Sequence, residues 1–122
     1  MKKRTKLKDS LKYAWQGLHA GLQNERNMKI HLVFVALVTA AGFLLEISTY
    51  EWLACLAFFG LVIGAELINT AIEAVIDLCS PEYNEKAKLA KNAAAGAVLV
   101  CSVLAAIAGI VIFLPKLWAL LS

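Results

Sequence analysis

Apolar residues dominate three long stretches of the chain, at residues 30–46, 52–78 and 93–115. A transmembrane helix needs about 20 mostly apolar residues, so each stretch suits one crossing, the first being short. Short polar segments join the stretches, and no repeat or long linker divides the sequence. The pattern predicts an all-α membrane protein whose residues 1–122 form one domain with three crossings.

A different pattern precedes the first crossing. Between residues 9 and 25, apolar residues recur at steps of three and four, and polar residues fall on the other side. This spacing predicts an amphipathic helix that lies along the cytoplasmic membrane surface instead of crossing the bilayer. Its apolar positions are Leu11, Trp15, Leu18 and Leu22, and its polar positions are Lys12, Gln16, His19 and Gln23.

Three carboxylates and one amide interrupt the second apolar stretch, at a spacing that puts them on one face of a helix. They are Glu66, Asn69, Glu73 and Asp77, called the acidic stripe below. Ionisable groups are costly inside a bilayer and usually mark a functional site. The alternative is a polar seam that joins transmembrane helices by hydrogen bonds. We favour a site, because three carboxylates exceed what packing needs.

The chain has 12 Lys and Arg, nine Asp and Glu and a net charge of +3. Eight of the basic residues precede the first crossing and three lie between the second and third. By the positive-inside rule both segments are cytoplasmic, which predicts a multi-pass protein of the cell inner (cytoplasmic) membrane with a cytoplasmic N-terminus. The cations then face lipid headgroups, so no nucleic-acid partner is expected. The eleven residues are Lys2, Lys3, Arg4, Lys6, Lys8, Lys12, Arg26, Lys29, Lys86, Lys88 and Lys91.

Soluble nucleotide-binding motifs are absent, since the chain has neither a P-loop nor a kinase-type glycine-rich loop. Two carboxylates near the water interface, with lysines close by, suit Mg²⁺ held together with nucleotide phosphates. Glu66 lies about 10 Å deeper than Glu73, where it can accept a proton from an alcohol arriving through the membrane. Glu25 either meets Glu73 or is an exposed glutamate paired with a neighbouring cation.

The histidines and cysteines show no metal-ligand spacing. His19 and His31 are interpreted as interfacial side chains, and Cys55, Cys79 and Cys101 as small buried ones. Three transmembrane helices are too few to surround a polar site formed by one of them, so we expect the chain to form an oligomer.

Residues 66–77, Glu-Leu-Ile-Asn-Thr-Ala-Ile-Glu-Ala-Val-Ile-Asp, resemble the signature of the bacterial integral-membrane diacylglycerol kinase family. The likeness covers nearly the whole chain, including Trp15-Gln-Gly-Leu, Asn24-Glu25, Glu82-Tyr83 and Ala90-Lys91. It implies a homotrimer with a surface helix and three transmembrane helices per chain, whose active sites are shared between neighbouring chains. It also implies that ATP enters from the cytoplasm and that a lipid alcohol is the acceptor.

The resemblance implies roles for individual residues. Glu66 matches the general base and a substrate-binding position, and Asn69 matches its hydrogen-bonding neighbour. Glu25 and Glu73 match carboxylates that bind the metal and the ATP phosphates. The remaining ATP-side positions are Tyr13, Glu82, Tyr83, Lys91 and Asn92, and Trp15 is assigned to the lipid.

One position departs from the family: the usual Lys-Asp pair is Lys91-Asn92 here. Asparagine still donates and accepts hydrogen bonds but lacks the negative charge.

The segment from Asn24 to His31 looks like the Gram-positive branch of the family, whose members phosphorylate undecaprenol more readily than diacylglycerol. We therefore predict an undecaprenol kinase that uses ATP and Mg²⁺. Diacylglycerol remains the alternative substrate, because both lipids present one hydroxyl below an apolar tail. From other classes, a small proton-coupled transporter and a structural membrane subunit also remain.

Overall fold

The computed structural model describes residues 6–122. In these residues the chain forms four helices: α1 (Leu7–Asn24), α2 (Arg26–Leu44), α3 (Thr49–Cys79) and α4 (Glu85–Leu121). Helices α2, α3 and α4 are long and apolar enough to cross a membrane. The prediction of an all-α protein with three such helices is therefore confirmed. Lys2, Lys3 and Arg4, which contribute to the predicted topology, lie outside the described residues.

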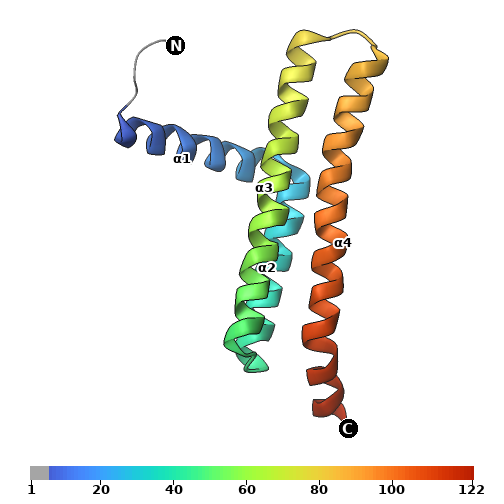
Figure 1. Cartoon of the computed structure of the whole chain (residues 1–122). Coiled ribbons are helices and arrows are strands. Elements are labelled where there is room, and N and C mark those ends of the chain that lie inside the picture. Colours follow the sequence, from blue (N-terminus) through green and yellow to red (C-terminus); the bar gives the residue numbers. More distant parts are fainter. Residues whose placement is uncertain (1–5) are drawn as a thin grey trace.

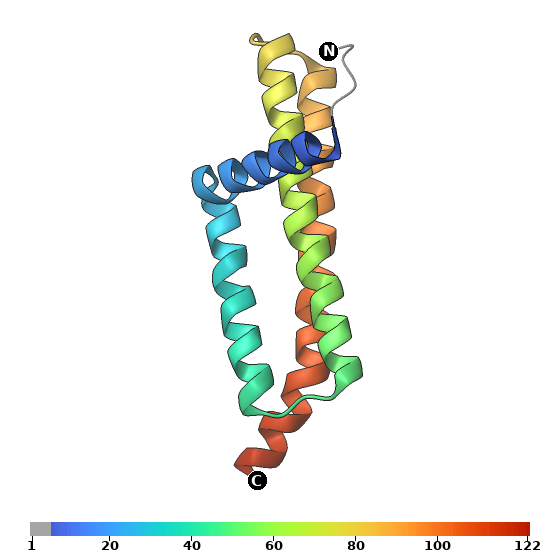
Figure 2. The same ribbon diagram turned by 90° about the vertical axis from the view of Figure 1, so that its left-hand side faces the viewer.

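Helices α2, α3 and α4 run alongside one another, and α1 lies across them (Figures 1 and 2). Helices α3 and α4 form an antiparallel hairpin, since only residues 80–84 separate them. The side chain of Asn84 caps α4 by accepting hydrogen bonds from the backbone N–H groups of Lys86 and Ala87. Ser48 and Glu51 form a capping box at the start of α3. The first turns of α3 and α4 are thus fixed by local hydrogen bonds.

Two glycines mark where helices approach closely. A Cβ at Gly42 would lie 2.6 Å from Trp52 Cη2, so the end of α2 packs directly on the indole of α3. A Cβ at Gly21 would lie 2.5 Å from Leu67 Cδ2, so α1 meets α3 beside Leu67. The second contact places α1 at the level of Glu66, the residue before Leu67.

Helices α3 and α4 extend past α1 at the end of the hairpin (Figures 1 and 2). The 31 residues of α3 span about 46 Å at 1.5 Å per residue, and the hydrocarbon core is about 30 Å thick. From Thr49 to Glu66 the helix rises about 26 Å, so Glu66 lies nearly one hydrocarbon thickness along the helix from its start. The last 13 residues of α3 continue beyond it.

The helices differ from the predicted ranges at their ends. Helix α4 begins at Glu85 and passes through Pro115 to Leu121, beyond the expected 93–115. Hydropathy reports only the apolar part of a helix, while its hydrogen bonds continue outside the membrane. Helix α2 ends at Leu44, before the expected residue 46, where Glu46 adopts a positive φ of 52°.

The cysteines depart from the expectation that all three are buried. Cys55 is buried beside Ile47 and Ile112, Cys101 is half-buried, and Cys79 is exposed. The prediction for Cys79 is wrong because α3 extends past α1, so its last residue lies on the projecting end of the hairpin.

Candidate active site

The acidic stripe lies on α3 and divides into a buried and a more open half. Glu66 is 1% exposed and Asn69 is 7% exposed, whereas Glu73 is half-buried and Asp77 is exposed. Asn69 Nδ2 donates a hydrogen bond to Glu73 Oε1 at 3.0 Å. This bond links the buried half to the open half along a single face of the helix.

A histidine of α2 contacts the buried end of the stripe. His31 Nε2 lies 3.4 Å from Glu66 Oε2, although the pair lacks hydrogen-bond geometry. The sequence interpretation of His31 as an interfacial side chain did not anticipate this contact. It depends on the register between α2 and α3, which the spacing within either helix does not reveal.

Two buried oxygen atoms of the stripe lack a hydrogen-bond donor. They are Glu66 Oε2 and Asn69 Oδ1. A buried polar atom without a partner costs about 1–3 kcal/mol, and more for a charged group. A hydroxyl or another hydrogen-bond donor can satisfy such atoms.

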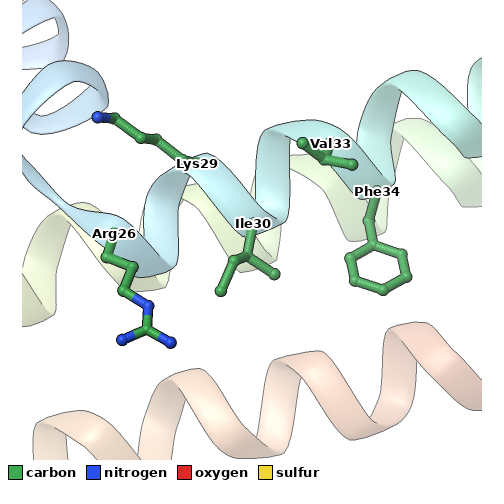
Figure 3. Close-up of a pocket in the computed structure, with 5 residues that line it drawn as sticks. All are labelled: Arg26, Lys29, Ile30, Val33 and Phe34. Atoms are coloured by element: carbon green, nitrogen blue, oxygen red, sulfur yellow. The ribbon is translucent and has the colours of Figure 1, made fainter.

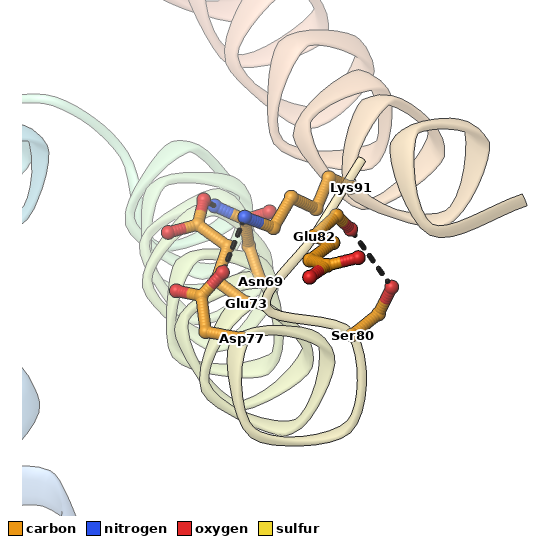
Figure 4. Close-up of polar contacts among 6 residues, drawn as sticks. All are labelled: Asn69, Glu73, Asp77, Ser80, Glu82 and Lys91. Carbon is orange, nitrogen blue, oxygen red and sulfur yellow. Dashed lines mark hydrogen bonds and ion pairs between the residues drawn. The ribbon is translucent and has the colours of Figure 1, made fainter. Parts of the chain in front are cut away.

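The open end of the stripe meets the start of α4 (Figure 4). Lys91 reaches from α4 across to α3 and pairs with Asp77 Oδ1. In the loop between these helices, Ser80 Oγ donates to the backbone oxygen of Glu82 at 3.2 Å. Lys91 and Asp77 thus pair at the end of the hairpin that projects past α1, and the Asn69–Glu73 hydrogen bond lies on the same helix, closer to Glu66.

The other predicted site residues are more scattered. Tyr13 and Trp15 are exposed on α1, Tyr83 is exposed in the loop after α3, and Asn92 is exposed on α4. Glu25 is half-buried at the junction of α1 and α2. Within residues 6–122, no hydrogen bond or ion pair joins Glu25 to Glu73. One chain thus brings together the acidic stripe, His31 and Lys91, but leaves the remaining positions apart.

The donor set suits Mg²⁺ better than a metal that needs a full protein cage. In the described part of the chain, no group of three or more His, Cys, Asp or Glu side chains could hold a metal ion. Mg²⁺ is typically bound by one or two carboxylates together with phosphate oxygens and water. Glu73, already hydrogen-bonded to Asn69, fits that requirement, and Glu25 remains the second carboxylate predicted from the sequence.

An apolar cavity of about 320 Å³ lies between α2, α3 and α4 and includes His31 in its wall. From His31 the cavity extends past Val62 and Ser102. It reaches Cys55, near the start of α3, and Ile112, near the end of α4. A separate recess of about 460 Å³ is formed by α2 alone, with Arg26 and Lys29 beside Ile30, Val33 and Phe34 (Figure 3). All five of these side chains are exposed in the single chain.

Comparisons with known proteins identify the family of this chain. Residues 12–113 match the family described as prokaryotic diacylglycerol kinase. The chain is 42% identical over 108 residues to an undecaprenol kinase of Bacillus subtilis, with 88% of each chain covered. It is 43% identical over 115 residues to a diacylglycerol kinase of Synechocystis, covering 92% of this chain and 65% of that relative. A diacylglycerol kinase of Escherichia coli is 33% identical over 95 residues, 78% of each chain. The chain therefore belongs to the prokaryotic diacylglycerol kinase family and is a lipid kinase.

Proposed function

We propose that this protein transfers the γ-phosphoryl group of ATP to the hydroxyl of undecaprenol, with Mg²⁺ as cofactor. The observation that carries the proposal is the buried oxygen Glu66 Oε2, which lacks a donor at the inner edge of the apolar layer. A membrane alcohol presents its hydroxyl at that depth. Undecaprenol is chosen because the match to the Bacillus subtilis enzyme spans 88% of both chains.

The acceptor hydroxyl is activated by Glu66. The hydroxyl donates a hydrogen bond to the carboxylate, and its proton passes to Glu66 as the lipid oxygen attacks the γ-phosphorus. The bond between the γ-phosphorus and the bridging oxygen breaks, and ADP leaves with that oxygen. Glu66 thus holds one proton after each transfer.

Lys91 acts on the nucleotide side. Its ammonium group lies at the projecting end of the hairpin, where it pairs with Asp77. A cation at this place stabilises the negative charge that develops on the phosphoryl oxygens during transfer. Asn69 holds Glu73 in position through the 3.0 Å hydrogen bond between their side chains.

Glu73 and Glu25 are the residues that would hold Mg²⁺ with the phosphates of ATP. When bound, the ion neutralises phosphate charge and orients the γ-phosphoryl group. The register of α2 against α3 supports the pairing, because His31 lies opposite Glu66 and the two helices are antiparallel. Glu73 lies seven residues after Glu66, about 10 Å along α3, and Glu25 lies six residues before His31, about 9 Å along the direction of α2. Because the helices are antiparallel, the two steps lead in the same direction.

The active form is proposed to be a homotrimer with sites completed by a neighbouring chain. The exposed face of α2, which includes Arg26, Ile30 and Phe34, leaves room for such a neighbour. The N-terminus is assigned to the cytoplasm. This orientation is supported by the basic residues of the α1–α2 junction and of the hairpin end, because both segments lie toward the same end of the bundle, while Lys116 pairs with Glu51 toward the other.

A lipid kinase assay with two acceptors tests the substrate. Purified protein in vesicles is given labelled ATP and Mg²⁺ with equal amounts of undecaprenol and diacylglycerol, and the extracted lipids are separated. We expect the label mainly in undecaprenyl phosphate. Preferential labelling of phosphatidic acid would reassign the substrate, and no labelled lipid would reject the proposal.

Asn92→Asp restores the charge usual in the family beside Lys91. A carboxylate makes stronger hydrogen bonds to a nucleotide donor than a neutral amide does, by about 1.5–3 kcal/mol at most. We expect a Michaelis constant for ATP that is lower, or a turnover that is higher, by a few-fold to tens-fold, with the choice of lipid unchanged. Steady-state kinetics with both lipids measure this, and a shift in lipid preference without any change in ATP kinetics would contradict the assignment.

A further inference from the structure

We infer that His31 removes the proton that Glu66 receives in each turnover and passes it to water at the cytoplasmic surface. The inference rests on the proposed function, in which Glu66 is the general base. It assigns a role to a residue that the sequence pattern did not single out.

Burial of Glu66 creates the need for such a group. Its side chain is only 2% exposed, so a proton on its carboxyl oxygen has little direct contact with water. The carboxylate must be restored before the next lipid can react. A nearby base that reaches water solves this problem, and among the described residues His31 is the ionisable side chain in contact with Glu66.

The geometry of His31 suits proton acceptance. Its Nε2 lies 3.4 Å from Glu66 Oε2, and its side chain is 18% exposed. A neutral imidazole with its hydrogen on Nδ1 presents a lone pair at Nε2, and two acceptors facing each other form no hydrogen bond. That description agrees with the absence of hydrogen-bond geometry between these atoms. Imidazole has two ring nitrogens, so it can accept a proton at one and release a proton from the other.

The proton can be followed through the cycle. The lipid O–H bond breaks and a Glu66 Oε2–H bond forms while the oxygen bonds to phosphorus. The proton then moves from Oε2 to Nε2, which leaves a carboxylate beside an imidazolium. Finally the imidazolium gives a proton to water, and both groups return to their starting states. The sum matches the one proton released when an alcohol is phosphorylated by ATP.

Few other ionisable groups compete for this role. From α3, Glu66 faces His31, and Cys55 lines the far part of the same cavity. The residues of α4 that line the cavity include no Asp, Glu, Lys, Arg or His. From α1, Gly21 makes the close approach to α3, and His19 lines a separate hollow with Trp15.

The first test separates the transfer step from proton removal. In His31→Asn, the first phosphoryl transfer at each site should keep its wild-type rate, because Glu66 begins as a carboxylate. Later turnovers should slow about tenfold, less than the 10² or more typical of losing a direct acid–base group. Rapid-quench kinetics in vesicles should therefore show a burst of one labelled lipid per site. The matched control is His19→Asn, which should show neither burst nor slowing.

The second test uses diffusible bases with His31→Ala. Imidazole should restore turnover several-fold, whereas pyrazole, of similar size but much weaker basicity, should not. Equal rescue by both would show that His31 only fills space. A first turnover slowed as much as later ones, or no slowing at all, would also overturn the inference. A wild-type protein that labels no lipid would instead reject the proposed function, so the two failures are distinguishable.

Discussion

Glu66→Gln is expected to lower turnover by about 10² or more, the usual contribution of a positioned general base. Glutamine keeps the shape of the side chain and a hydrogen-bond acceptor but cannot accept a proton at this position. Since Glu66 lies about 10 Å from Glu73 along α3, the nucleotide side should be preserved. The Michaelis constant for ATP, or binding of a non-hydrolysable analogue, should therefore stay near the wild-type value.

A matched control is available on the same helix. Glu51→Gln makes the identical change at the other end of α3, where Glu51 pairs with Lys116 and forms the capping box. It should affect stability slightly, because partly exposed ion pairs contribute little, and it should leave turnover within about twofold. Wild-type turnover by a well-folded Glu66→Gln protein would remove Glu66 from the reaction.

The polar face of α3 could be predicted from spacing alone. Offsets of three, seven and eleven residues place Asn69, Glu73 and Asp77 on the same helix face as Glu66, and the buried Glu66 and Asn69 agree with that prediction. Spacing alone left a transporter and a structural subunit as alternative functions of the chain. The family match decides against both, because the matched proteins are lipid kinases.

Contacts between helices could not be predicted in the same way. The pairing of His31 with Glu66 depends on how α2 and α3 are aligned, and Lys91 meets Asp77 only because α4 folds back against α3. Apolar length likewise marks where a helix crosses the bilayer and not where it ends. The projecting hairpin and the exposed Cys79 follow from hydrogen bonding that continues outside the membrane.

Glu25→Ala and Glu73→Ala are each expected to weaken productive MgATP binding by about tenfold to 10², the range for losing one hydrogen bond or contact to a charged group. Both changes should also raise the Mg²⁺ concentration needed for half-maximal rate. Glu85→Ala is the matched control, since Glu85 is an exposed carboxylate in the first turn of α4. It should leave both quantities unchanged.

The double variant decides whether the two carboxylates meet. If Glu25 and Glu73 share one Mg²⁺ and its phosphates, removing either already loses most of the shared interaction. The combined loss should then fall short of the sum of the single losses by about 0.5–3 kcal/mol, the range for residues in contact. Titrations of ATP and Mg²⁺ on the four proteins measure this coupling. Strictly additive losses, or an unchanged Mg²⁺ requirement in either single variant, would place Glu25 and Glu73 in separate sites.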